Sequence, residues 1–289
     1  MRHVRKRCES RPDRPRPAVV PGTQATPRAR CDAAADTLAR AVRHVARCYD
    51  SALTLRALSL DLDDTLWPIW PAIARAEQAL HAWLAEHAPR CAERYPPSAM
   101  RTLRERVASE HPHLAHDYSA QRRISLQAAL LESGECASLG DAAFEVFYAG
   151  RNQVELFPEV AAALARLAAR FPLAALTNGN ADLVRIGLDT HFAFTLGARE
   201  HGAPKPDASI FHAACARLGC APHEVLHVGD DPDLDVLGAQ RAGLRCAWIN
   251  RDDAPWPHPG APDVVVRDLG ALADWLDLNF PVLARTRRA

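Results

Sequence analysis

Residues 55–67 read LRALSLDLDDTLW, a short apolar run that ends in three carboxylates within four positions. The apolar part has the length and composition of a buried β-strand, so the acids follow directly at its carboxyl end. A buried carboxylate is costly unless a cation pairs with it. Asp61 and Asp63 therefore predict cationic partners that come from distant parts of the chain.

Beyond about residue 156, apolar strand-like segments alternate with helical ones. Strands are expected within 173–180, 193–198, 224–231, 246–250 and 263–266, and helices at 159–171, 181–192, 206–219 and 234–243. This alternation predicts a parallel sheet with helices on both faces. Residues 67–155 show only helical periodicity, which predicts an inserted all-helical cap, with hinges near 67–71 and 152–158. The catalytic core is then expected to comprise residues 55–66 and 156–289.

The composition is typical of a globular protein with no excess of basic or acidic residues. The chain has 289 residues, 48% of them hydrophobic, and 35 basic residues balance 35 acidic ones. We therefore expect no nucleic-acid partner, and no apolar run reaches the roughly 18 residues of a membrane span. These features predict a cytoplasmic protein without a membrane partner. No pattern encodes the oligomeric state.

The first 54 residues are expected to form a basic arm rich in Pro and Arg. We predict that this arm is disordered, with a possible helix at 32–48, and no motif ties it to chemistry. The eight cysteines include no CxxC pair. They are interpreted as reduced side chains and not as a disulfide framework or a zinc site.

Polar clusters follow three of the expected strands: Asp61 to Asp63, Thr177 to Asn180, and Gly229 to Asp231. In doubly wound sheets ligands bind beyond the carboxyl ends of the strands, so these clusters should converge. Oxygen ligands of this kind suit Mg²⁺, and the hydroxyl and amide donors suit a phosphoryl group. Each cluster alone has an ordinary explanation, such as a turn or a helix cap. Their joint occurrence favours a site.

The lysine content singles out one further residue. Only Lys6 and Lys205 are lysines, and the other 33 basic residues are arginines. A compact ammonium differs sterically from a guanidinium fork. Lys205 is therefore a candidate to contact both a carboxylate and a phosphate.

Together these residues resemble the four motifs of haloacid dehalogenase (HAD) superfamily phosphatases, over about residues 55–275. The motifs are Asp61-Leu62-Asp63-Asp64-Thr65, Thr177-Asn178-Gly179, Lys205 between two prolines, and Gly229-Asp230-Asp231 with Asp235. The resemblance implies an α/β fold, a Rossmann-like parallel sheet core with an inserted helical cap.

The resemblance also implies a Mg²⁺-dependent phosphomonoester hydrolase. Asp61 would form an aspartyl-phosphate and Asp63 would be the general acid and base. Its remaining assignments are Mg²⁺ ligation by Asp61, Asp63 (through its main-chain carbonyl), Asp230 and Asp231 or Asp235, and substrate binding by Thr65, Thr177, Asn178, Gly179 and Lys205.

The stretches HDYSAQRR, FTLGAREHGAPKPD and EVLHVGDDPDLDVLGAQRAG further resemble bacterial flavin mononucleotide (FMN) phosphatases. Some of these act on the riboflavin precursor 5-amino-6-(5-phosphoribitylamino)uracil. The resemblance thus implies a small phosphorylated metabolite as substrate. A nucleotide or sugar phosphatase, a phosphomutase and a non-catalytic phospholigand-binding protein stay open.

Two related chemistries are disfavoured by single residues. Hydrolytic dehalogenases of the superfamily lack the second acid, here Asp63, because a halide leaves without a proton. Phosphonate-cleaving relatives use a cap lysine, and residues 67–155 contain none.

Side chains of the expected cap provide weaker signals. His111, His113 and His116 form a histidine-rich loop that more often lies at the surface than binds metal. His116, Asp117, Arg122 and Arg123 are expected on the face that meets the substrate, whereas Trp67 and Trp70 either stack on a substrate ring or pack the cap onto the core.

Overall fold

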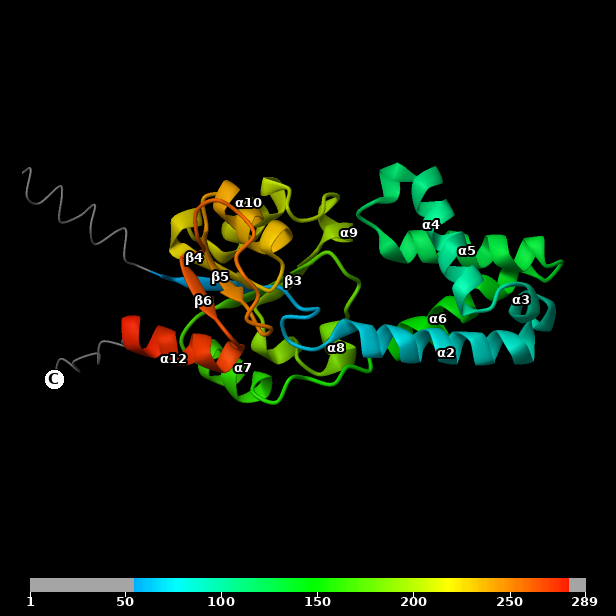
Figure 1. Ribbon diagram of the computed structural model, residues 1–289, viewed down its shortest axis with the longest axis horizontal. Coiled ribbons are helices and arrows are strands. Elements are labelled where there is room, and N and C mark those ends of the chain that lie inside the picture. Colours follow the sequence, from blue (N-terminus) through cyan, green and yellow to red (C-terminus); the bar gives the residue numbers. More distant parts are fainter. Residues whose placement is uncertain (1–54, 281–289) are drawn as a thin grey trace, which may run out of the picture. The chain divides into compact units, whose positions relative to one another are not determined.

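The computed structural model describes residues 55–280 (Figure 1). The predicted arm at 1–54, with its possible helix at 32–48, lies outside the described residues, as do residues 281–289.

The described chain is built on a six-stranded, fully parallel sheet with the strand order β3-β2-β1-β4-β5-β6. Its strands are β1 (Ala57–Leu60), β2 (Leu173–Thr177), β3 (Phe194–Gly197), β4 (Val225–Gly229), β5 (Arg245–Ile249) and β6 (Val264–Val266). Each coincides with a segment from which a strand is expected, apart from β5, which begins one residue earlier, at Arg245. The predicted α/β, Rossmann-like fold class is therefore confirmed.

Alternation along the strands assigns side chains to two apolar layers. Leu58 and Leu60 face the layer that contains α7 (Val160–Ala168) and α12 (Leu269–Asn279), whereas Ala57 faces α10 (Ala208–Leu218). Figure 1 shows α7 and α12 together on one side of the sheet and α10 on the other. Every β1 side chain is buried, as expected for a central strand covered on both faces.

Two of the expected helices differ from their prediction. Within 181–192 the helix α8 (Leu183–Ile186) is short, because Gly187 adopts a φ of 83° and ends it, and a 3₁₀ turn (Asp189–His191) follows. Residues 234–243 fall in a π-helical segment, η5 (Pro232–Leu237), that continues as α11 (Gly238–Arg241). Periodicity alone does not reveal either feature. The remaining short elements here are α9 (Ala198–His201) and η4 (Pro222–Glu224).

Between β1 and α7 the chain forms a group of helices, called here the helical insertion. It comprises α2 (Ile69–His87), α3 (Pro89–Arg94), α4 (Pro97–Glu110), η1 (Pro112–Leu114), α5 (Tyr118–Glu132), η2 (Ala137–Leu139) and α6 (Gly140–Arg151). These helices share an apolar cluster that includes Leu84, Leu103, Leu126, Leu130 and Phe147, separate from both layers of the sheet.

The insertion begins at a tight turn after β1. Asp64 adopts a φ of 59°, and its carboxylate accepts from the main-chain N–H of Ile69 at 2.9 Å, where α2 starts. Trp67 is completely buried and belongs to the apolar layer of the sheet, whereas Trp70 is exposed. Trp67 therefore packs into the core and does not offer its ring to a ligand.

Helices α2 and α6 approach closely because α6 has a glycine at the contact. A Cβ at Gly150 would lie 2.9 Å from Cα of Ala76 in α2.

No helix within 55–280 is both long and apolar enough to cross a membrane.

Substitution of Gly150 by Ala is expected to lower the free energy of unfolding by about 1 kcal/mol, because overpacking outweighs the gain in helix propensity. Gly140→Ala is the matched control, since its Cβ would meet the flexible Gln127 side chain, with Cγ at 3.0 Å. Urea denaturation of both variants tests this. Equal stability of the two variants would contradict close helix packing at Gly150.

Candidate active site

The sheet brings the predicted site residues to one edge. Strands β2, β1 and β4 are neighbours, so the residues at their carboxyl ends, Thr177, Asp61 and Asp230, lie side by side. They line a cavity of about 300 Å³ together with Asp63, Gly179, Asp231, Asp235, Asn178, Arg151 and Lys205. Residues separated by more than 160 positions thus share one cavity.

Lys205 is the cation that the buried acids require. Its side chain is only 2% exposed, and Nζ lies 2.5 Å from Asp61 Oδ1 and 2.6 Å from Asp235 Oδ1. Burial alone would lower the pKa of Lys205, but attraction to Asp235 and Asp61 outweighs it and raises that pKa. The ammonium therefore stays charged.

Asn178 holds the main chain of Lys205. Its Nδ2 donates to the Lys205 carbonyl at 2.9 Å, and its Oδ1 accepts from the Lys205 N–H at 2.7 Å. Both ends of the amide are thereby occupied, so the Asn178 side chain positions the lysine. Thr177 Oγ1 accepts from the Gly179 N–H at 2.9 Å, which leaves the hydroxyl proton available for donation.

Asp235 is anchored from both sides by a buried network. Its Oδ1 also lies 3.0 Å from His227 Nε2, and His227 Nδ1 lies 2.9 Å from Ser59 Oγ. Burial opposes ionisation, but Lys205 and His227 hold the pKa of Asp235 at about 2. Burial also lowers the pKa of His227, so the ring is assigned as neutral, donating through Nε2.

Three carboxylates form a cluster beside Lys205. One oxygen of each of Asp61, Asp230 and Asp235 lies within 4.8 Å of the others. Thr65, fully buried, stands between two of them, with Oγ1 2.9 Å from Asp230 Oδ1 and 3.2 Å from Asp61 Oδ2. Its hydroxyl is thus directed to the acids and does not line the cavity.

Burial raises the pKa of Asp230 to about 7, and the Asp235 carboxylate adds to this effect. Burial likewise raises the pKa of Asp61 well above its usual value, because it and the neighbouring carboxylates outweigh the pairing with Lys205. One ammonium therefore does not neutralise the cluster. A hard divalent cation fits this all-oxygen donor set.

Asp231 lines the same cavity and also caps a helical segment. Its carboxylate accepts from the N–H groups of Asp233 and Leu234, both at 2.8 Å, and so caps η5. Its own N–H donates to Asp235 Oδ2 at 3.2 Å. The cap explanation that the sequence left open therefore describes this carboxylate.

Asp63 lies at the border of the cavity and bonds to the helical insertion. Arg151 Nη2, at the end of α6, lies 2.8 Å and 2.6 Å from its two oxygens, and Trp67 Nε1 donates to Oδ1 at 2.9 Å. Sequence reasoning missed Arg151 and His227. Nothing distinguishes Arg151 from the other arginines, and His227 within strand β4 looks like an ordinary core residue.

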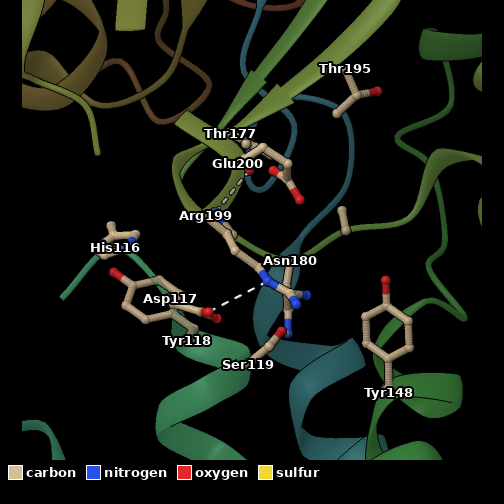
Figure 2. A pocket seen from close by; sticks show the side chains of 13 residues that line it. His116, Asp117, Tyr118, Ser119, Tyr148, Thr177, Asn180, Thr195, Arg199 and Glu200 are labelled. Atoms are coloured by element: carbon tan, nitrogen blue, oxygen red, sulfur yellow. Dashed lines mark hydrogen bonds and ion pairs between the residues drawn. The ribbon is translucent and has the colours of Figure 1, made fainter. Parts of the chain in front are cut away.

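A second cavity of about 270 Å³ adjoins the first. The two share Tyr118, Thr177, Gly179 and Asn180, and the second is also lined by His116, Asp117, Ser119, Tyr148, Ala181, Thr195, Gly197, Arg199 and Glu200. Figure 2 shows Arg199 directed toward Asp117, with Tyr118 and Tyr148 on opposite sides of the cavity. The Arg199 to Asp117 distance is 3.4 Å. The insertion and the sheet domain thus both supply walls.

His116 and Asp117 line this second cavity, as expected of residues that meet a substrate. Arg122 and Arg123 instead stack on Phe147 and Phe144, at 3.4 Å and 3.8 Å from the ring centroids. The two arginines therefore serve the packing of the insertion.

Comparison with known proteins gives a consistent family. A family model described as haloacid dehalogenase-like hydrolase matches residues 55–243. The chain is 34% identical to the 5-amino-6-(5-phospho-D-ribitylamino)uracil phosphatase YigB of Escherichia coli strain K12, over 78% of this chain and 98% of that protein. A phosphoserine phosphatase of Thermus thermophilus is 40% identical over 49% of this chain and 59% of its own length.

Among solved structures, a crystal structure described as a 2-haloacid dehalogenase from Pseudomonas syringae pv. Tomato DC3000 is 41% identical. It covers 78% of this chain and 99% of its own, with a TM-score of 0.74. The relatives therefore carry two kinds of activity in their names, on phosphate esters and on haloacids.

Substitution of Lys205 by Met is expected to lower the free energy of unfolding by about 3–5 kcal/mol, because it leaves buried carboxylates without their cation. Arg56→Met, which removes an exposed ion pair to Glu224 of 3.0 Å, is the control and should cost less than about 1 kcal/mol. Urea denaturation in chelator measures both. Equal losses would show that Lys205 does not stabilise the acid cluster.

Proposed function

Because the chain belongs to the haloacid dehalogenase-like hydrolases and has phosphatases among its relatives, we propose that it hydrolyses phosphomonoesters through an aspartyl-phosphate on Asp61. The observation that carries this proposal is the placement of two carboxylates on one cavity. Asp61 is paired with the Lys205 ammonium at 2.5 Å, and Asp63 borders the same cavity.

In the first half-reaction an oxygen of Asp61 attacks phosphorus, and the bond from phosphorus to the ester oxygen breaks. Asp63 gives its proton to the departing oxygen, so that an alcohol leaves. Lys205 and the Thr177 hydroxyl, both on the cavity wall, stabilise the charge on the phosphoryl oxygens.

In the second half-reaction Asp63, now a carboxylate, takes a proton from water. The resulting hydroxide equivalent attacks phosphorus, phosphate leaves, and Asp61 is regenerated. Asn178 contributes by holding Lys205 through two hydrogen bonds to its main chain. Gly179 contributes by leaving space, because a Cβ there would lie 2.5 Å from Asp63 Oδ2.

Mg²⁺ is the cofactor that this donor set suits; the carboxylates of Asp61 and Asp230 and the main-chain carbonyl of Asp63 would hold it. When bound, it offsets the negative charge of the carboxylates and of the phosphoryl group. The Asp235 carboxylate lies close to those of Asp61 and Asp230, but its Oδ1 pairs with Lys205 Nζ at 2.6 Å. We therefore assign Asp235 to the positioning of the lysine.

We infer that the helical insertion is the cap and that the second cavity receives the alcohol part of the substrate. Cavities of about 300 Å³ are at the small end of the range for metabolite sites. The second cavity offers two tyrosines, Asn180 and a charged pair, which suit a polyhydroxylated chain and a heteroaromatic ring. FMN and the ribitylamino-uracil phosphate named for YigB are of this class.

Hydrolysis of a 2-haloacid is the second candidate, because the similar Pseudomonas structure is described as a dehalogenase. A halide leaves without a proton, so such a reaction gives Asp63 no task in the departure of its leaving group. The carboxylate is nevertheless present on the cavity wall and fixed by three hydrogen bonds. This favours the phosphate ester.

Purified protein is expected to release phosphate from FMN and from the ribitylamino-uracil phosphate at higher kcat/KM than from nucleoside monophosphates or sugar phosphates. Asp61→Asn is the control and should lose at least about a thousandfold, because it lacks the nucleophile. Halide release from 2-chloropropionate is measured in parallel.

Release of halide without release of phosphate would overturn the proposal in favour of the second candidate. Phosphate release by Asp61→Asn at the wild-type rate would overturn the assignment of the nucleophile. Equal activity on all phosphate esters would overturn the substrate class alone.

Mg²⁺ affinity is expected to rise with pH through about 7, the pKa of Asp230. Below this pH the metal-free carboxyl is protonated and must lose its proton to bind, whereas above it no proton is displaced from Asp230. Calorimetry at about pH 6 and about pH 8, in buffers of different ionisation enthalpy, measures affinity and proton release. Equal affinity at both pH values would contradict Asp230 as a ligand, and Asp230→Asn is the control.

A further inference from the structure

Arg151 is a buried cation that the assigned chemistry does not yet use. It is the last residue of α6, where the helical insertion returns to the sheet domain, and it is 1% exposed. It also lines the cavity of about 300 Å³ that contains Asp61 and Asp63. A guanidinium is rarely buried without a specific partner, so its contacts indicate what it is there for.

The guanidinium holds Asp63 and the loop after β2 at once. Nη2 lies 2.8 Å from Asp63 Oδ1 and 2.6 Å from Oδ2, and Nε donates to Asn180 Oδ1 at 2.9 Å. Asn180 Nδ2 in turn donates to Ser119 Oγ, in α5 of the insertion, at 3.1 Å. Arg151 thus fixes the distance between the Asp63 carboxylate and the loop that begins directly after Thr177 and contains Gly179.

The remaining nitrogen of Arg151 takes no part in these contacts. Nη1 is buried and has no hydrogen-bond partner among the described residues. An unmade bond of this kind costs about 1–3 kcal/mol. The hydrogen bonds that Arg151 makes to described side chains are all to Asp63 and Asn180.

The two oxygens of Asp63 have different surroundings. Oδ1 accepts from both Trp67 Nε1 and Arg151 Nη2, whereas Oδ2 has Arg151 as its single donor among the described residues. Beside Oδ2 lies Gly179, where a Cβ would come within 2.5 Å of that oxygen. Oδ1 is therefore the anchored oxygen, and Oδ2 faces the space that the glycine leaves open.

We propose that Arg151 is a positioning residue that fixes the Asp63 carboxylate so that Oδ2 exchanges the proton with the leaving alcohol and with water. The inference rests on the proposed phosphatase function. It adds a residue of the insertion, outside the four motifs, to the control of the proton transfer. Arg151 acts through Asp63 and not by binding the phosphoryl group itself.

A double-mutant cycle with two substrates tests this. The variants are Arg151→Met, Asp63→Asn and their combination, and kcat/KM is measured on an alkyl phosphate and on p-nitrophenyl phosphate. The parameter kcat/KM covers the steps up to departure of the leaving group. Nitrophenolate departs without a proton, so its formation does not depend on Asp63.

Arg151→Met is expected to lower kcat/KM for the alkyl phosphate about a hundredfold, because a displaced acid transfers its proton poorly. The same substitution should lower kcat/KM for p-nitrophenyl phosphate by no more than about threefold. When Arg151→Met is added to Asp63→Asn, it should lower kcat/KM for either substrate by no more than about twofold further, because the two residues act as one unit. Arg151→Lys keeps the charge without the guanidinium fork and should restore only part of the activity. If Arg151→Met does not fold, Arg151→Lys replaces it in the comparison of the two substrates.

Arg185→Met is the matched control for docking of the insertion. Arg185, in α8, pairs with Glu145 of the same helix α6 at 2.6 Å, outside both cavities. Its loss should change kcat/KM equally for the two substrates, because Arg185 lies over the Tyr148 ring of the second cavity, at 4.8 Å, and makes no bond to Asp63. Circular dichroism and urea denaturation verify that each variant is folded.

Equal losses on the two substrates, or an undiminished effect of Arg151→Met in the Asp63→Asn background, would overturn the role of Arg151. The proposed function would then stand, because the wild-type protein turns over. Absence of phosphate release by the wild-type protein would overturn both.

Discussion

The interaction on which the site depends is the burial of one ammonium among several carboxylates at the end of a parallel sheet. Lys205 lies 2.5 Å from Asp61 and 2.6 Å from Asp235. Without it, the carboxylates that follow the neighbouring strands β1 and β4 would repel one another and lose their charge to protons. The lysine needs its own support, which Asn178 gives through the main chain and His227 gives through Asp235.

Burial disfavours the ionised form of each carboxylate, but it also makes the pKa values of the neighbouring carboxylates differ. Asp235 is held ionised with a pKa of about 2 beside Lys205, whereas Asp230 is raised to about 7. One acid thus has a permanent partner, and another is left undercompensated. This difference divides the cluster into a part that positions the lysine and a part that suits a divalent cation.

Much of the fold was predictable because the strands have local signatures. Six short apolar segments and their polar carboxyl ends specify the parallel sheet and the position of Asp61, Thr177 and Asp230 at one edge. Arg151 was not predictable, because its contact with Asp63 spans 88 positions and depends on how α6 packs. Likewise, Arg122 and Arg123 in α5 stack on phenylalanines of α6, which helical periodicity does not encode.

The path of the chain explains why Asp63 is a sensitive position. The insertion leaves the sheet domain just after Asp63 and returns at Arg151, so both junctions lie beside one carboxylate. Trp67 at the first junction and Arg151 at the second both donate to Asp63. Any rotation of the insertion about these junctions would therefore move Arg151 relative to Trp67, which packs in the sheet layer, and would disturb the contacts of the carboxylate. In this arrangement the insertion residues that we propose to contact the substrate are mechanically linked to Asp63, the residue that we propose transfers its proton.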